Sequence, residues 1–230
     1  MKPSLVLFDL DGVLLDSRSN MEKSWEAVRT EFPHITATFQ DYFSRIGRPF
    51  NDILSLLNIP QDPLIQFVYN KASKDNRHLV KPFEGVHTLL VKLQSLGYML
   101  GIVTSKDLER TGLMLDDAGI EKFFDTRLIL TPSEEFRGKP APDQLMYAMA
   151  IANVDPSNTF YIGDMLTDAQ AAARSGCNFI FAPWGYAVET TRVFNSIYWM
   201  YDDINKPISQ QAKFMQDIVS IVSEYYKHRK

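Results

Sequence analysis

The sequence of 230 residues contains a single cysteine, Cys177. An intramolecular disulfide and a cysteine-based metal cluster are therefore excluded. The scarcity of cysteine fits a reducing compartment, so we expect a cytoplasmic protein. No apolar run approaches the roughly 18 residues of a membrane-spanning helix. The apolar run near the N-terminus ends at Asp9, too soon for the apolar region of a signal peptide, and we expect no association with a membrane.

The chain also lacks an excess of positive charge. It has 24 Lys and Arg against 28 Asp and Glu, a formal net charge of -4. Proteins that bind nucleic acid or anionic membranes usually carry a basic patch, so we expect no nucleic-acid partner. The apolar content of 45% is ordinary for a globular protein. The length allows one large domain, or a core with a smaller inserted domain.

The first informative stretch is a short apolar run, Leu5 to Phe8, that leads directly into Asp9 and then Asp11-Gly12. Such a run predicts a strand buried on both faces, as in parallel sheets. In open α/β sheets the ligand crevice lies outside the carboxyl ends of the strands. Two carboxylates facing that crevice would serve as nucleophile and acid, or would bind a cation. The alternative is an aspartate-rich turn without a chemical role.

The remaining chain divides into a helical and an α/β part. Within residues 17–81, apolar residues recur at three- and four-residue spacing, as at Met21, Trp25 and Val28, which is typical of amphipathic helices. From residue 82 onward, short apolar runs alternate with helical patterns, which indicates βαβ units and a parallel sheet. We therefore predict an α/β core domain of residues 1–16 and 82–230, with an inserted all-helical domain of residues 17–81. The predicted later strands span 98–103, 126–130, 159–162 and 179–182, and the last predicted helix spans 215–226.

Three further motifs follow predicted strands. The strand at 98–103 runs into Thr104-Ser105, where a hydroxyl and a backbone N–H would donate to a phosphoryl oxygen. The alternative is a helix N-cap. Lys139 stands among prolines in Gly138-Lys139-Pro140-Ala141-Pro142, which hold the backbone stiffly. Its cation would lie near charged oxygens, although most lysines are simply solvated.

The third of these motifs is acidic. Gly163-Asp164 and Asp168 follow the strand at 159–162. If a helix starts at once, the two aspartates share one helix face. An oxygen-rich site with few protein ligands suits Mg²⁺. The alternative is that Asp164 caps the helix and Asp168 is a favourable charge in its first turn.

Together the four motifs resemble those of the haloacid dehalogenase-like (HAD) hydrolases. They occur in the family's order, as Asp9-Leu10-Asp11-Gly12-Val13, Thr104, Lys139-Pro140-Ala141-Pro142 and Gly163-Asp164 through Asp168. Phe160 to Gly176, followed by Trp184-Gly185-Tyr186, looks most like the phosphoglycolate-phosphatase branch. The resemblance implies a Rossmann-like parallel sheet with a helical cap, and a Mg²⁺-dependent phosphomonoesterase that acts on a small phosphorylated metabolite.

The resemblance also implies roles for individual residues. Asp9 would attack phosphorus to form an aspartyl-phosphate, and Asp11 would protonate the leaving oxygen and then activate water. The expected Mg²⁺ ligands are Asp9, Asp11 through its backbone carbonyl, Asp164 and Asp168, where Asp168 orients either a metal-bound water or Lys139.

Substrate contacts follow from the same resemblance. Thr104, Ser105 and Lys139 would hold the phosphoryl oxygens. Arg48, in the Gly47-Arg48-Pro49 turn of the helical segment, is expected to meet a carboxylate or a second phosphate of the substrate, or else is a solvated arginine.

Other functions on the same fold stay open at this level. A dehalogenase needs no second aspartate, so Asp11 argues against one. A mutase resembling β-phosphoglucomutase shares every core motif. A non-catalytic regulatory protein would be expected to have lost a motif residue, and here all of the motif acids and Lys139 are present.

Overall fold

The computed structural model describes residues 4–187, 209–211, 215 and 217–227. Its centre is a six-stranded sheet in the order β5-β4-β1-β6-β7-β8, with parallel pairing between neighbours. The strands are β1 (Leu5–Phe8), β4 (Met99–Val103), β5 (Ile129–Leu130), β6 (Thr159–Gly163), β7 (Asn178–Phe181) and β8 (Ser209–Gln211). The chain adds β4 and β5 on one side of β1, then β6 to β8 on the other. A crevice for a ligand is expected where the strand order reverses in this way, at the carboxyl end of β1.

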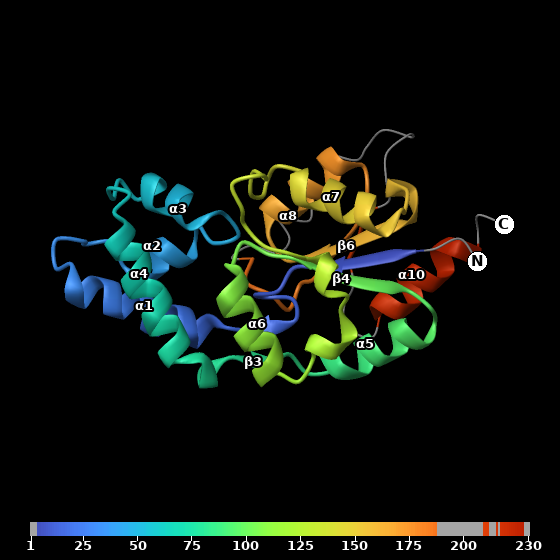
Figure 1. Cartoon of the computed structure of the whole chain (residues 1–230), viewed down its shortest axis with the longest axis horizontal. Helices are drawn as coiled ribbons and strands as arrows, with labels where there is room; N and C mark the ends of the chain where they lie inside the picture. The colour runs from blue at the N-terminus through green and yellow to red at the C-terminus, as the bar shows by residue number, and fades with distance from the viewer. Residues whose placement is uncertain (1–3, 188–208, 212–214, 216, 228–230) are drawn as a thin grey trace.

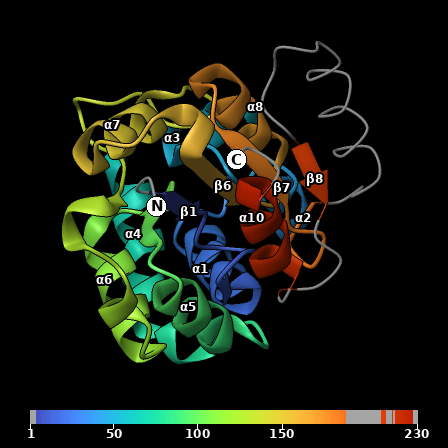
Figure 2. The same ribbon diagram turned by 90° about the vertical axis from the view of Figure 1, so that its right-hand side faces the viewer.

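Helices cover both faces of the sheet (Figures 1 and 2). Val6 and Phe8 pack in one apolar cluster, with α5 (Val86–Ser95), α6 (Leu108–Asp117) and α10 (Asp217–Lys227). Leu5 and Leu7 pack in another, with α7 (Asp143–Ala152) and α8 (Leu166–Ser175). Because successive residues of a strand point to opposite faces, the apolar run of β1 is buried on both sides. The prediction of an α/β fold with a parallel sheet is confirmed.

The first four helices lie to one side of this sheet, at the left of Figure 1. They are α1 (Arg18–Glu31), α2 (Phe39–Phe43), α3 (Phe50–Leu56) and α4 (Pro63–Asp75), and we call residues 17–81 the cap segment. It has an apolar cluster of its own, in which fully buried Trp25 stacks on Tyr42 with ring centroids 4.6 Å apart. The division into a core domain and a cap domain stays a prediction, and part of the predicted core, within 188–230, lies outside the described residues.

The chain crosses between these parts twice, side by side. The outward crossing, β2 (Leu15–Asp16), pairs antiparallel with the return crossing, β3 (Lys81–Pro82). The sequence does not predict this pair of strands, because two residues are too few to show a strand pattern.

Several predicted boundaries are wrong in detail. Residues 126–128 of the predicted third strand form a 3₁₀ turn, and only Ile129–Leu130 join the sheet. Helix α8 begins at Leu166, so Asp164 precedes the helix and shares no helix face with Asp168. The further 3₁₀ turns are Arg77–Leu79, Glu121–Phe123 and Pro156–Asn158. Within the described part of the chain, we find no helix with the length and apolar character to cross a bilayer.

Candidate active site

Asp9 lies where β1 leaves the sheet. Its backbone N–H donates to the carbonyl oxygen of Ile162 at 2.8 Å. This bond extends the β1–β6 pairing by one residue and fixes the backbone position from which the Asp9 side chain extends. The residue is only 4% exposed. Its carboxylate therefore lies in the crevice that the strand order creates at the carboxyl end of β1.

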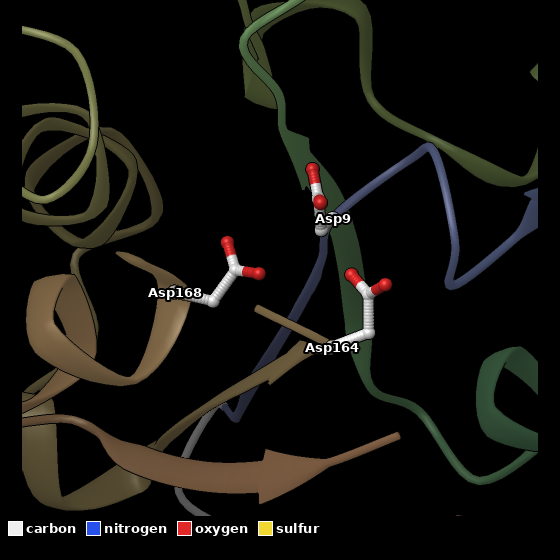
Figure 3. Close-up of side chains that lie close together, drawn as sticks. All are labelled: Asp9, Asp164 and Asp168. Atoms are coloured by element: carbon white, nitrogen blue, oxygen red, sulfur yellow. The ribbon is translucent and has the colours of Figure 1, made fainter. Parts of the chain in front are cut away.

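Two more carboxylates reach the same place from another part of the chain. Asp164 follows β6, and Asp168 lies in the first turn of α8, where its Oδ2 accepts from the Met165 N–H at 2.9 Å. One oxygen of each of Asp9, Asp164 and Asp168 lies within 4.8 Å of the others, and Figure 3 shows the three side chains gathered at the strand ends. Three carboxylates in one buried space require a compensating positive charge.

The pKa values of these acids reflect that requirement. Burial raises the pKa of Asp9 to about 7, against the opposing charge of Lys139 and with a further increase from Asp168. Burial, and then the negative charges of Asp168 and Asp9, also raise the pKa of Asp164 well above its ordinary value. Both carboxylates are thus costly to ionise unless a cation further to Lys139 is present.

Lys139 supplies one compensating charge. Its Nζ lies 2.9 Å from Asp9 Oδ1 and 2.7 Å from Asp168 Oδ1, and it donates to the Tyr161 hydroxyl at 3.1 Å. Burial alone would lower the pKa of Lys139, but the attraction of Asp168 and Asp9 outweighs burial and raises it. The lysine is therefore a permanent buried cation, not the solvated side chain that the sequence left as an alternative.

The surroundings of Asp164 fit a second cation. Its Oδ2 accepts from the Tyr186 N–H at 2.6 Å, but its Oδ1 is buried without a hydrogen-bond partner among the described residues. Two glycines pack closely against this carboxylate. A Cβ on Gly12 would lie 2.3 Å from Asp164 Oδ2, and a Cβ on Gly185 would lie 2.3 Å from Asp164 Cβ, so a larger residue at either position would displace Asp164. An orphaned carboxylate oxygen beside two further carboxylates is an all-oxygen donor set, which matches the preference of Mg²⁺.

Asp11 points to different partners from Asp9. Its Oδ1 accepts from the Ser17 hydroxyl at 2.6 Å, and its Oδ2 lies 3.1 Å from the Nζ of Lys106. Lys106 is 5% exposed, and burial lowers its pKa, against the attraction of Asp11. Both oxygens of Asp11 are thus fixed, while its side chain stays 16% exposed.

The residues predicted to contact substrate line one pocket of about 70 Å³ between the core and the cap segment. Thr104 and Ser105 enter it from the end of β4, and Arg48 enters from the cap segment. The Thr104 hydroxyl accepts from the Lys106 N–H at 3.1 Å, and the Ser105 hydroxyl donates to the carbonyl of Gly47 at 3.3 Å. Asp9, Asp11 and Lys139 also line the pocket, whereas Asp168 reaches it through its ion pair with Lys139.

Several residues of this pocket were not predicted from the sequence. Lys106 and Arg110 follow Thr104 closely, and both are buried in its wall. Arg110 donates from Nε to Asp107 Oδ2 at 2.6 Å, and its guanidinium lies 5.5 Å from the centre of the Tyr69 ring. The sequence did contain one signal for them: Lys106 and Arg110 are cationic and come soon after Thr104, which ends a predicted strand and was expected to contact phosphate.

Comparison with known proteins agrees with this geometry. The pyrophosphatase PpaX of Bacillus velezensis is 29% identical over 78% of this chain and 82% of its own length. The N-acetylmuramic acid 6-phosphate phosphatase of Pseudomonas aeruginosa is 27% identical over 81% of this chain and 84% of its own. The phosphoglycolate phosphatase of Thiobacillus denitrificans is 26% identical over 79% and 83%.

Solved structures share the fold. A putative phosphoglycolate phosphatase from Lactobacillus plantarum superposes with a TM-score of 0.80 at 19% identity, and covers 96% of this chain and 100% of its own. The family model described as haloacid dehalogenase-like hydrolase matches residues 6–182, a range that includes every predicted site residue. The resemblance seen in the four motifs is confirmed, and the chain belongs to the haloacid dehalogenase-like hydrolases.

Proposed function

We propose that this protein is a Mg²⁺-dependent phosphomonoesterase that hydrolyses a small phosphorylated metabolite through an aspartyl-phosphate on Asp9. The observation that carries the proposal is the meeting of the Asp9, Asp164 and Asp168 carboxylates within 4.8 Å, with Lys139 ion-paired to Asp9 and Asp168. The named activities of the relatives, all on phosphate compounds, support it. A cytoplasmic location stays a prediction.

The metal would be held by Asp9 and Asp164, with the backbone carbonyl of Asp11 as a further ligand and Asp168 beside them. When bound, Mg²⁺ supplies positive charge that offsets the repulsion among the carboxylates and withdraws charge from the transferred phosphoryl group. Of the two roles expected for Asp168, the 2.7 Å contact with Lys139 favours orientation of the lysine.

In the first step an oxygen of Asp9 attacks phosphorus. The new bond joins that oxygen to phosphorus, and the bond from phosphorus to the leaving-group oxygen breaks. Asp11 donates a proton to the departing oxygen, so that a neutral hydroxyl leaves. Its fixation by Ser17 and Lys106 holds the carboxyl group in one orientation for this transfer.

In the second step water hydrolyses the aspartyl-phosphate. Asp11, now a carboxylate, takes a proton from water as the water oxygen bonds to phosphorus. The bond between phosphorus and Asp9 breaks, which releases inorganic phosphate and restores both acids. Lys139 and Thr104 hold the phosphoryl oxygens through both steps, as preorganised donors in a water-poor pocket.

The cap segment would select the leaving group. The phosphate compounds in the names of the three relatives, pyrophosphate, phosphoglycolate and N-acetylmuramic acid 6-phosphate, all carry a second anionic group. In this chain Arg48 and Arg110 both line the pocket that Asp9 and Asp11 also line. We therefore propose that the substrate also carries a second anion, which these arginines meet.

A screen for phosphate release tests the proposal. The purified protein is incubated with a panel of metabolite phosphates, with and without Mg²⁺, and inorganic phosphate is measured. Mg²⁺-dependent release from at least one small phosphate ester is expected. Transfer of the phosphoryl group to a second sugar hydroxyl, without release, would instead identify a mutase, and inertness toward every ester would favour a non-catalytic role.

A further inference from the structure

Tyr186 connects three parts of the molecule that the proposed chemistry uses separately. It follows β7 in the core, yet its ring belongs to the apolar cluster of the cap segment and lies 5.2 Å from the ring of Phe43. Its backbone N–H donates to Asp164 Oδ2 at 2.6 Å. Its phenol lies at the outward crossing into the cap segment. A single residue thus contacts the acidic cluster, the cap segment and the crossing.

The phenol oxygen is fully used at that crossing. It accepts from the backbone N–H of Ser17 at 2.6 Å, and its own proton is within reach of Asp16 Oδ1 at 2.9 Å and of the Leu15 carbonyl at 3.4 Å. The Ser17 hydroxyl lies 3.5 Å away. Ser17 is completely buried, so its N–H has no access to bulk water and depends on the phenol for a partner. Loss of the hydroxyl would leave that N–H unsatisfied and allow Ser17 to move.

Ser17 passes this constraint to Asp11. The Ser17 hydroxyl donates to Asp11 Oδ1 at 2.6 Å, so the backbone position of Ser17 sets one of the two bonds that orient the acid. The path from the Tyr186 hydroxyl to the Asp11 carboxyl therefore consists of two hydrogen bonds. Each is 2.6 Å long, and both are largely shielded from solvent. A separate path runs from the Tyr186 backbone to Asp164 and does not involve the hydroxyl.

The loop around Tyr186 is built for this close approach. A Cβ on Gly185 would lie 2.5 Å from the carbonyl oxygen of Gly12 and 2.4 Å from Asp164 Oδ2, so a larger residue would push the loop away from both. Trp184 also donates from its indole N–H to the Val13 carbonyl at 3.2 Å. The loop of Trp184, Gly185 and Tyr186 thus packs closely against the turn that carries Asp11.

We propose that Tyr186 is a positioning residue, whose hydroxyl holds Ser17 and thereby aligns Asp11 for proton transfer. The inference rests on the function proposed above. It goes further in assigning to a residue outside the four motifs a role in positioning the general acid–base group, and it separates that role from the metal site, where the backbone N–H of Tyr186 donates to Asp164.

The test compares Tyr186→Phe, Ser17→Ala and the double variant with two probes, glycerol 2-phosphate and p-nitrophenyl phosphate. Release of the leaving group in the first turnover is measured by rapid quench with enzyme in excess. Because misalignment of a catalytic group can cost up to about 10²-fold, we expect each single variant to release glycerol at least about 10-fold more slowly. Release of p-nitrophenol should fall no more than about two-fold, since an acidic leaving group needs little protonation.

Further measurements separate positioning from mere structural support. If both residues act on one path, the double variant will be no slower with glycerol 2-phosphate than the slower single variant. The rise in melting temperature caused by Mg²⁺ should be unchanged in Tyr186→Phe, because the backbone bond to Asp164 remains. Trp184→Phe is the matched control, since it removes another hydrogen bond of the same loop without a route to Ser17.

The outcomes are distinct. Equal slowing with both probes, multiplicative losses in the double variant, or the same leaving-group dependence in Trp184→Phe would overturn the inference while the proposed function stands. If Tyr186→Phe does not fold, Ser17→Ala alone decides by the same comparison. If the wild-type protein releases neither leaving group with Mg²⁺ but hydrolyses another alkyl ester of the panel, that ester replaces glycerol 2-phosphate in the same comparison. If it hydrolyses no ester at all, the proposed function fails, and the inference fails with it.

Discussion

Lys139 Nζ lies 2.7 Å from Asp168 Oδ1, and both residues are buried. The lysine is also 2.9 Å from Asp9, so one ammonium group is ion-paired with two buried carboxylates. Removal of one partner from such a buried ion pair leaves an uncompensated charge, which costs more than the pair itself contributes. We therefore expect the pair to serve both the proposed chemistry and the fold around it.

Lys139→Met should impair both activity and stability. We expect kcat to fall by about 10²–10³, as for the loss of a preorganised donor, and the free energy of unfolding to fall by about 3–5 kcal/mol because Asp9 and Asp168 lose their counter-charge. The double variant Lys139→Met/Asp168→Asn is the control: it should regain part of the stability but none of the activity. A Lys139→Met protein with wild-type kcat would contradict the proposed role.

The stability of the metal-free protein should fall as the pH rises. The folded pKa of Asp9 is about 7 against an ordinary value of 3.8, so between these values the folded state holds more protons than the unfolded state. Stability then decreases with pH across this window, and the raised pKa of Asp164 acts in the same direction. With excess chelator, the melting temperature should be lower at pH 8 than at pH 5.

Asp164→Asn serves as the control for this pH dependence. It removes a buried charge yet keeps an oxygen that accepts from Tyr186, so the metal-free variant should be more stable than wild type at pH 8. A gain of about 1 kcal/mol would raise the melting temperature by about 2–4 °C in a protein of this size. Mg²⁺ should stabilise wild type more at pH 8 than at pH 5, and Asp164→Asn little at either. A flat pH profile in chelator would count against the acidic cluster as described.

Activity should require Mg²⁺ and should be suppressed by Ca²⁺. The donor set holds only oxygen atoms, and Ca²⁺ takes more ligands in a looser geometry than Mg²⁺, which would disturb the in-line arrangement that phosphoryl transfer needs. Phosphate release is measured in chelator, with Mg²⁺, and with Ca²⁺ added to saturating Mg²⁺. Full activity in excess chelator would refute the metal dependence.

Asp9→Asn and Asp11→Asn should fail at different steps. Asp9→Asn loses the nucleophile, so it should show no turnover and no covalent phosphate. Asp11→Asn keeps the nucleophile, and should be slowed by about 10²–10⁴ on alkyl phosphates. With p-nitrophenyl phosphate its first step should partly recover, and the aspartyl-phosphate should accumulate because hydrolysis lacks its base.

Rapid-quench mass spectrometry of Asp11→Asn locates the covalent phosphate. The added mass is expected on the peptide that contains Asp9. The same mass on another residue, or turnover by Asp9→Asn, would require a different nucleophile.

Arg48→Ala should alter substrate choice and leave the chemistry intact. A hydrogen bond to a charged group contributes about 1.5–3 kcal/mol, so kcat/KM for the best anionic substrate should fall about 10-fold or more, with little change for p-nitrophenyl phosphate. Arg45→Ala is the matched control, because the hydrogen bonds of Arg45 within the described residues are local, to Asp41 and Ser44, and Arg45 is not among the residues that line this pocket. Equal losses on both substrates would instead mean that Arg48 contributes to the phosphoryl-transfer step or to the stability of the fold.

The parts of the site that the sequence reveals are those that follow apolar runs. Asp9, Thr104 and Asp164 each follow a buried strand, at the point where the run of apolar residues stops. Lys139 is recognisable by the prolines beside it. Their convergence follows from the parallel sheet alone, because carboxyl ends of parallel strands share one edge. The strand order places β4 and β6 on either side of β1.

The remaining features lack a local signal. Strand β8 is Ser209–Gln211 with the sequence SQQ at the sheet edge, where no apolar run marks it. Ser17 and Tyr186 are 169 positions apart, so no window of sequence contains both. In the sequence Lys106 and Arg110 look like ordinary polar residues of a helix start, and nothing local indicates that both are buried.

The paired crossings β2 and β3 have a consequence for how such a protein can change. Asp16 lies opposite Lys81 in one antiparallel pair, so the long segment between them leaves and rejoins the core at a single point. Insertions are tolerated best where both ends meet at the surface, and the entropy of closing a loop rises only slowly with its length. A core of this kind can therefore accept helical inserts of different size and sequence without a change in strand order, and exchange of the insert would redirect the enzyme to new esters while the acids at the strand ends stay in place.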